Sequence, residues 1–256
     1  MLANNNKMII NKLAKNSVKS NKKQYGILFF TIVLSAFMLF CVFTIGWTYL
    51  DSSRLQNTRL NGAEYDITTM NGFTSKQVKS LQSNKNIQNV GMESYAGFIK
   101  SSEFDNTVEI GLLWCDETFW NNLMSPARTK LDGHYPQNKN ELMVTKDILK
   151  ACGNENLSVG DSIVLTYENN TGVHTDKFVI SGIWDGYGDK SAGFVSKNFY
   201  DETGYDLKND GILCIKLNRN YVLPTTIQSL EKSLNFSDRQ IFAPTDYIEN
   251  SFKLLL

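Results

Sequence analysis

Histidine is rare in this chain and its cysteines are not clustered, which argues against a metal centre. There are two histidines and four cysteines, and no two cysteines have the CxxC spacing that is typical of zinc sites. Cys41 lies within a long apolar stretch, where a thiol behaves as a small apolar side chain. Cys115, Cys152 and Cys214 are predicted to be buried thiols; a disulfide between two of them is the alternative if they face an oxidising compartment.

The common catalytic motifs are also absent. The sequence contains no GxxxxGK[ST] phosphate loop, no GxSxG nucleophile motif and no HExxH metal motif. Asp185 and Asp189 could form a carboxylate pair, but a flexible loop after a strand explains them better, and His134 is expected to be a turn residue. No basic surface interleaved with aromatic residues suggests nucleic-acid binding. We therefore predict no catalytic, cofactor-binding or metal-binding residue in this chain, which argues against an enzyme.

Acidic residues are missing from the first part of the chain, so charge is sorted along it. The first 24 residues hold six lysines and no aspartate or glutamate. From Asp51 onward, 26 − 6 = 20 basic residues stand against 26 acidic ones, which gives a net charge of 20 − 26 = −6. The two regions are separated by an apolar stretch. This pattern predicts membrane topology rather than a nucleic-acid partner.

The apolar stretch, residues 25–49, is predicted to cross a membrane. It contains no charged residue, and at ~1.5 Å per residue a helix of this length spans roughly 37 Å, enough for a ~30 Å hydrocarbon core. Tyr25 at one end and Trp47 and Tyr49 at the other suit the headgroup regions. The stretch is too long for the core of a cleaved signal peptide and too apolar for a soluble helix. The lysines place the N-terminus in the cytoplasm and the main domain outside the plasma membrane.

Apolar residues also recur with helical spacing before the predicted span. Ile10, Leu13, Ala14 and Val18 are separated by lysines, as in a basic amphipathic helix that lies on an anionic inner leaflet. A polar tail that only sets the topology is an equally good interpretation.

Beyond the span, the pattern predicts an α+β domain with mixed sheets. Residues 50–60 are expected to continue the helix as a stalk that ends at Asn61-Gly62. Strands are predicted at 65–70, 108–114, 141–144, 192–195 and 211–217, and a hairpin at 162–167 and 177–184 around Asn169, Asn170 and Gly172. Helices are predicted from the capping box at Thr74, at 116–124 and 145–152, after the cap Ser196, and at 225–234.

Three segments in this domain carry a family resemblance. Residues 133–144, GHYPQNKNELMV, resemble the G-x-x-P-x-x-x-x-E-[IL]-x-[IV] segment of the MacB-like extracytoplasmic core domain. Residues 157–165, LSVGDSIVL, resemble the [IV]-G-D-x-[IV] turn that leads into a strand, and residues 178–183, FVISGI, resemble the F-x-[IV]-x-G-[IV] strand. Gly160-Asp161 suits a tight turn, and Gly182 is expected at a crowded sheet position. Each motif is weak alone; their order behind a lysine-flanked span makes the set more specific.

The resemblance implies a permease subunit of an FtsX/MacB-type ABC transporter. Members of that family work with an ABC ATP-binding subunit in the cytoplasm and with a second permease copy or paralogue. ATP-driven motion reaches the external domain through the membrane helices and acts there on a peptide, lipoprotein or antimicrobial. Members of that family carry at least three more membrane helices after the domain, and this sequence ends where the second membrane helix of such a permease is expected to begin. The alternatives are a single-span membrane-anchored sensor and a surface binding protein.

The predicted organisation follows from these segments. It is a cytoplasmic basic segment (1–24), a transmembrane helix (25–49), a stalk (50–62), a MacB-like extracytoplasmic domain (63–250) and the start of a second membrane helix (251–256).

Overall fold

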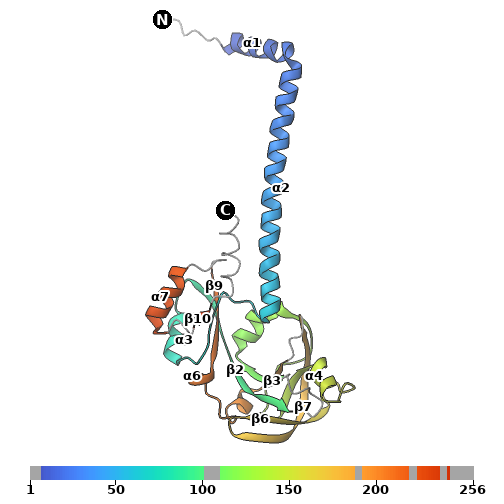
Figure 1. Ribbon diagram of the computed structural model, residues 1–256, viewed down its shortest axis with the longest axis vertical. Coiled ribbons are helices and arrows are strands. Elements are labelled where there is room, and N and C mark those ends of the chain that lie inside the picture. Colours follow the sequence, from blue (N-terminus) through green and yellow to red (C-terminus); the bar gives the residue numbers. More distant parts are fainter. Residues whose placement is uncertain (1–6, 101–109, 188–191, 219–223, 237–240, 243–256) are drawn as a thin grey trace. The chain divides into compact units, whose positions relative to one another are not determined.

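The computed structural model describes residues 7–100, 110–187, 192–218, 224–236 and 241–242 (Figure 1). The chain divides into two compact units, Met1–Arg54 and Leu55–Leu256. The second membrane helix predicted at 251–256 and the side chain of Asp189 lie outside the described residues.

Two helices make up the first unit. Helix α1 is Lys7–Ser20, and helix α2 is Lys22–Asn61, which continues into the second unit. Between Tyr25 and Tyr49 the apolar side chains of α2 are mostly exposed, and α2 is the one described helix that is long and apolar enough to cross a membrane. The predictions of a helix over 25–49 and of its continuation as far as residue 60 are confirmed, because the structure has no break before Asn61.

The second unit contains a ten-stranded mixed sheet, so the prediction of a mixed α/β domain is confirmed. Its order is β10-β1-β9-β2-β3-β8-β5-β7-β4, with β6 pairing with both β2 and β7. The strands are β1 (Ile67–Thr69), β2 (Ile87–Lys100), β3 (Ile110–Cys115), β4 (Arg128–Gly133), β5 (Glu141–Thr145), β6 (Ser162–Asn169), β7 (Gly172–Gly186), β8 (Gly193–Val195), β9 (Ile212–Leu217) and β10 (Ile241–Phe242). The helices are α3 (Ser75–Gln82), the π-helix η1 (Phe119–Leu123), the 3-10 helix η2 (Ser125–Ala127), α4 (Lys146–Ala151), α5 (Lys197–Tyr200), α6 (Leu207–Asp210) and α7 (Pro224–Leu234).

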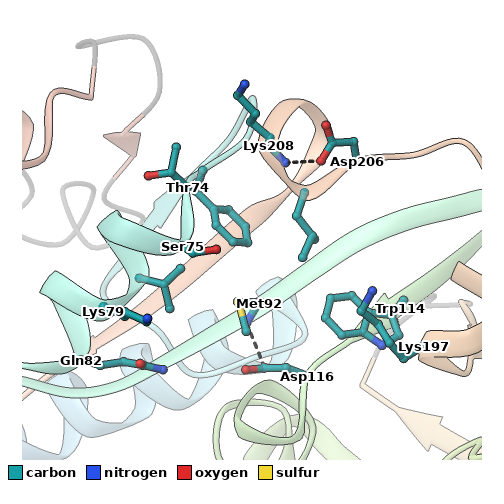
Figure 2. A pocket seen from close by; sticks show the side chains of 13 residues that line it. Thr74, Ser75, Lys79, Gln82, Met92, Trp114, Asp116, Lys197, Asp206 and Lys208 are labelled. Atoms are coloured by element: carbon teal, nitrogen blue, oxygen red, sulfur yellow. Dashed lines mark hydrogen bonds between the residues drawn. The ribbon is translucent and has the colours of Figure 1, made fainter. Parts of the chain in front are cut away.

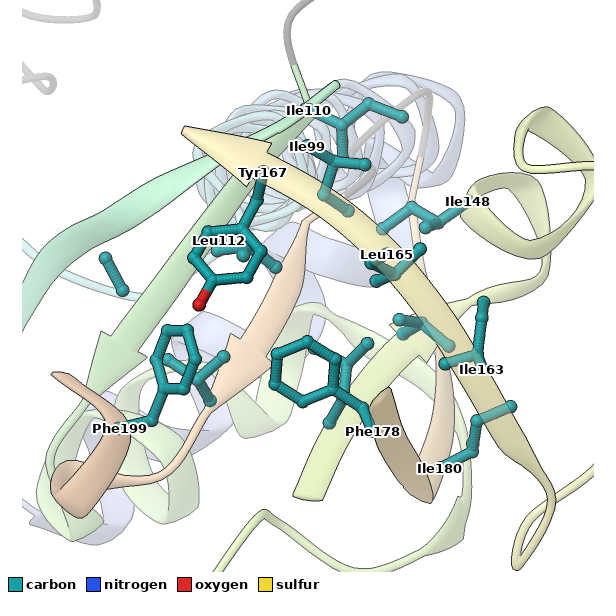
Figure 3. Packing of buried hydrophobic residues seen from close by; sticks show 14 of the residues in the cluster. Ile99, Ile110, Leu112, Ile148, Ile163, Leu165, Tyr167, Phe178, Ile180 and Phe199 are labelled. Atoms are coloured by element: carbon teal, nitrogen blue, oxygen red, sulfur yellow. The ribbon is translucent and has the colours of Figure 1, made fainter. Parts of the chain in front are cut away.

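Apolar side chains of this unit gather in three clusters. The first surrounds Phe178 and is formed mainly by β3, β5, β6 and β7, with Phe199 from α5 (Figure 3). The second lies where α3 and α7 cover β1 and β9, and the third surrounds Trp120 of η1. Strand β2 supplies Val90 to the second cluster and Ile99 to the first, so this one strand joins the two.

Local sequence signals account for several boundaries. The hydroxyl of Thr74 accepts a hydrogen bond from the N–H of Gln77 (3.3 Å), and the side chain of Gln77 accepts one from the N–H of Thr74 (2.7 Å). This is the predicted capping box. Ser196 caps α5 by accepting from the N–H of Phe199 at 3.2 Å, as its position predicted.

Two glycines of the resembling segments stand where a side chain does not fit. A Cβ on Gly182 would lie 2.9 Å from the carbonyl oxygen of His134 and 3.2 Å from that of Asp132. The crowding predicted for Gly182 is confirmed. Gly133 has φ +85°, and a Cβ there would lie 2.2 Å from the carbonyl oxygen of Ser181. Close approach of β4 to β7 therefore requires glycine on both strands.

The predicted hairpin is confirmed, but its turn is shorter than expected. Strands β6 and β7 pair as far as Asn169 and Gly172, so the turn consists of Asn170 and Thr171 alone. Asn169 ends the ladder and accepts a hydrogen bond from the N–H of Thr171 (2.8 Å), which explains why a residue predicted for the turn lies in the strand.

Three further details differ from the sequence predictions. The helix predicted at 116–124 contains a π-helix at its centre, although Phe119, Trp120 and Leu123 are buried as expected. Cys152 is partly exposed rather than buried, because it lies after the last turn of α4. Strands β2, β4 and β10 and the short helix α6 are absent from the predictions.

Candidate functional site

A groove of about 700 Å³ lies where the first and second apolar clusters meet (Figure 2). Met92 of β2 and Leu207 of α6 pack against both clusters and also line the groove. Figure 2 shows Thr74, Ser75 and Lys79 on one side of β2 and Trp114 with Lys197 on the other. The groove is therefore built on the strand that joins the two clusters.

The inside of the groove is apolar and fixed by the fold. Phe73 and Val78 are buried in the second cluster and Trp114 is buried in the first, yet each still lines the groove. The ring of Trp114 stacks on that of Tyr200, with centroids 5.2 Å apart and planes at 28°. An apolar ligand side chain could pack against this wall without any rearrangement of the cluster.

Lysines stand on the rim of the groove. The Nζ atom of Lys197 lies 5.1 Å from the centroid of the Trp114 ring and also forms an ion pair with Asp201. Lys79 and Lys208 are exposed on the opposite rim, on α3 and α6. The combination of an apolar trough and amino groups suits an extended ligand that carries both apolar and anionic groups.

Asp116 lines the groove, and its carboxylate forms hydrogen bonds that hold the fold together. Its Oδ1 atom accepts hydrogen bonds from the N–H groups of Met92 (2.9 Å) and Phe119 (2.8 Å). Burial raises the pKa of Asp116 above its ordinary value, although the two N–H groups act in the opposite direction. The carboxyl group therefore links β2 to η1 through its hydrogen bonds. Burying its negative charge costs free energy of folding, because the charge loses part of its hydration.

Replacing Asp116 with asparagine is expected to stabilise the chain at neutral pH. An amide oxygen can accept the same two hydrogen bonds, and the buried charge is lost. Because the folded-state pKa of Asp116 is raised, its ionisation disfavours folding above that pKa. The advantage of the variant should therefore shrink as the pH falls through the folded-state pKa and vanish below the unfolded value, near 3.8. Chemical denaturation of the full chain in detergent between pH 4 and 7 measures this.

Asp116→Ala provides the matched comparison. It removes the charge and both hydrogen bonds, so it is expected to destabilise the chain by about 1–3 kcal/mol at neutral pH. A pH-independent difference between Asp116→Asn and the unmodified chain would contradict the desolvation argument.

The side chains that the sequence analysis weighed for catalysis, His134 and Asp185, do not line this groove. His134 is exposed beside the close approach of β4 and β7, with Nδ1 3.0 Å from the carbonyl oxygen of Tyr135, in keeping with a turn residue. Asp185 is exposed and accepts a hydrogen bond from the N–H of Gly186. Within the described parts of the chain, no three histidine, cysteine or acidic side chains are grouped to hold a metal ion.

The cysteines are all free, and two of them are deeply buried. Burial raises the pKa of the Cys115 and Cys214 thiols well above the ordinary value, so both stay protonated and unreactive at neutral pH. The phenolic oxygen of Tyr135 accepts a hydrogen bond from the N–H of Cys115 at 3.0 Å, which ties the resembling segment to the end of β3.

The groove was not predicted from the sequence. Met92 lies on the missed strand β2, and Trp114 and Asp116 were assigned only to elements. The one available signal was a buried-strand tryptophan followed closely by an acidic residue, Trp114-Cys115-Asp116, which does not indicate a ligand site by itself.

No family model and no curated protein sequence matches this chain. Its fold is similar to the periplasmic region of MacB from Actinobacillus actinomycetemcomitans, at 13% identity and a TM-score of 0.48, with 76% of this chain and 95% of that one covered. It is also similar to the extracellular domain of the ABC-type transporter YknZ from Gram-positive bacteria, at 11% identity and a TM-score of 0.45, with 70% of this chain and 98% of that one covered.

Proposed function

We propose that this chain is a permease subunit of an FtsX/MacB-type ABC transporter, with its N-terminus in the cytoplasm and its second unit outside the plasma membrane. The observation that carries the proposal is the unbroken helix α2, which runs from Lys22 through the apolar stretch to Asn61. A surface protein needs only a tether between its span and its domain, whereas a transporter that acts on an external domain needs a stiff connection.

The end of α2 is fixed within the second unit, as this function requires. Thr58 is buried, and the guanidinium carbon of Arg59 lies 3.9 Å from the centroid of the Tyr187 ring. Just beyond the helix, Ala63 packs in the third apolar cluster and the N–H of Glu64 donates to the carbonyl oxygen of Leu123 at 2.7 Å. A displacement of the last turns of α2 would therefore act directly on η1.

The proposed partners are those that the family resemblance implies. Because its sequence has no phosphate loop, the proposal places ATP hydrolysis in a separate ABC ATP-binding subunit. A second permease copy or a paralogue completes the transporter in the bilayer. The groove is the proposed contact for a peptide, lipoprotein or antimicrobial that is exported or extracted.

Two linked measurements test this function. The chain, purified from its native membrane in mild detergent, is expected to carry an ABC ATP-binding subunit and vanadate-sensitive ATP turnover. Adding ATP is then expected to change hydrogen exchange in the second unit. Inserting Gly-Ser-Gly-Ser between Arg54 and Leu55 interrupts α2 and should abolish that change while the subunits stay together.

The outcomes separate the alternatives. A chain that carries no ATP-binding subunit and no ATP turnover contradicts the permease function and leaves a membrane-anchored sensor or surface binding protein. An insertion variant that still transmits the ATP-dependent change contradicts the role of α2 in transmission.

A further inference from the structure

Helix α1 presents two different faces along its length. At ~100° per residue, three of the four lysines of α1 lie on one face, called the lysine face, and these are Lys12, Lys15 and Lys19. The opposite side is called the apolar face of α1. Lys7 opens the helix on this side, and the face itself consists of Ile9, Ile10, Leu13, Ala14, Ser17 and Val18.

Within the first unit, the described residues leave the apolar face of α1 uncovered. Ile9 and Ile10 are each 61% exposed and Leu13 is 64% exposed. Exposed apolar surface of this extent marks a site of interaction, and the described residues of the first unit do not cover it.

Ser17 shows which way the apolar face is turned. It follows Leu13 by four residues and Ile10 by seven, so it lies in the middle of that face. Its Oγ atom is 3.3 Å from the phenolic oxygen of Tyr25, the residue that opens the apolar stretch of α2. The joint between the helices is itself hydrogen-bonded: the N–H of Asn21 donates to the carbonyl of Ser17, and that of Tyr25 to the carbonyl of Asn21, both at 3.1 Å. The apolar face is thus held toward the start of the predicted span.

We propose that α1 binds in the plane of an anionic lipid leaflet, with its apolar face at the boundary between headgroups and acyl chains. Tyr25 suits headgroup depth, and its contact with Ser17 brings α1 to the same level. Lys12, Lys15 and Lys19, followed by Lys22 and Lys23, provide charge that lipid phosphates balance, with no acidic residue in the helix. An acidic protein surface fits less well, since it would leave the apolar face exposed.

This inference requires that α2 spans the bilayer, which is one part of the proposed function, and it is independent of any ATP-binding subunit. The full chain is reconstituted alone into vesicles of phosphatidylcholine, or of phosphatidylcholine with about one third phosphatidylglycerol. Resistance to alkaline extraction establishes that α2 is inserted in both. If the chain is extracted at alkaline pH, α2 does not span the bilayer, and the membrane topology of the proposed function is contradicted. The measurements that follow test only the binding of α1 to the leaflet.

Hydrogen exchange of the α1 amides is the first measurement. Exchange is expected to be about tenfold slower in the vesicles that contain phosphatidylglycerol, since binding suppresses fraying of a short helix. The variant Lys12→Gln/Lys15→Gln/Lys19→Gln should lose this difference. A matched variant with three exposed lysines of the second unit changed, Lys85→Gln/Lys150→Gln/Lys177→Gln, should keep it. Equal exchange in both lipids overturns the proposal, and so does an unchanged difference in the first variant.

The depth of the helix gives a second, independent result. A polarity-sensitive fluorophore is attached at Leu13→Cys on the apolar face or at Met8→Cys on the lysine face, after the four native cysteines are replaced. The label at position 13 is expected to shift to shorter wavelength with phosphatidylglycerol, and the label at position 8 is not. Equal spectra at the two positions overturn the proposed orientation of α1.

Discussion

Replacing Phe178 with alanine is expected to lower the free energy of unfolding of the chain by about 3–5 kcal/mol. The side chain is 1% exposed and lies at the centre of the first apolar cluster (Figure 3). Its ring packs against those of Phe199 and Tyr167, with centroids 5.5 and 6.1 Å apart. The strands that surround the resulting cavity belong to one sheet, so they cannot collapse into it without breaking strand pairs.

Chemical denaturation of the full chain in detergent, followed by tryptophan fluorescence, measures the loss. Val173→Ala is the matched control, because it shortens a side chain on the same strand that is 64% exposed. Its effect should stay within about 0.5 kcal/mol. Similar losses for the two variants would contradict the placement of Phe178 at the centre of the core.

Replacing Gly133 with alanine is expected to destabilise the chain much more than the same change at Gly160. The two glycines have similar backbone conformations, φ +85° and φ +93°, so alanine meets similar backbone strain at both, about 1–2 kcal/mol. At Gly160 a Cβ has nothing within 4 Å, whereas at Gly133 it would lie 2.2 Å from the carbonyl oxygen of Ser181. The collision adds roughly 1–3 kcal/mol, because β4 must move away from β7.

The difference between these two variants isolates the strand contact from the dihedral strain. It is read from denaturation midpoints of the full chain, provided that the denaturant dependence is unchanged. Equal destabilisation would mean that β4 does not approach β7 closely, and the glycine that begins the resembling segment would then have no packing role.

The sequence was most informative where one residue type alone satisfies a local requirement. Thr74 with Gln77, Ser196 and Gly182 each indicated their structural role, because caps and crowded glycines depend on a narrow choice of side chain. The hairpin was recognisable for the same reason. Strand β2 was not, since the register shifts between Ile87 and Asn89 and again between Tyr95 and Gly97 interrupt its alternation.

The sequence patterns did not predict how segments that are distant in the chain pack together. Strand β4 is an exposed edge strand, so it lacks the apolar alternation by which strands are recognised. The groove depends on Met92 and Leu207 meeting two clusters at once, and no local pattern encodes that meeting. The predicted topology of the N-terminal segment depends only on composition, that is on the lysines, and it stays a prediction.

The sheet order has a consequence for how the domain is made. The middle of β1 pairs with β9, and Thr68 lies within hydrogen-bonding distance of Cys214, 146 residues later. At ~5–20 residues per second, the ribosome needs roughly 7–30 s to complete that interval. Strands β2 and β3 can pair early, but β1 leaves the ribosome long before its partner exists. We expect newly synthesised chains to pass through a state in which one side of β2 is an open edge, and this is the stage at which they are most exposed to aggregation.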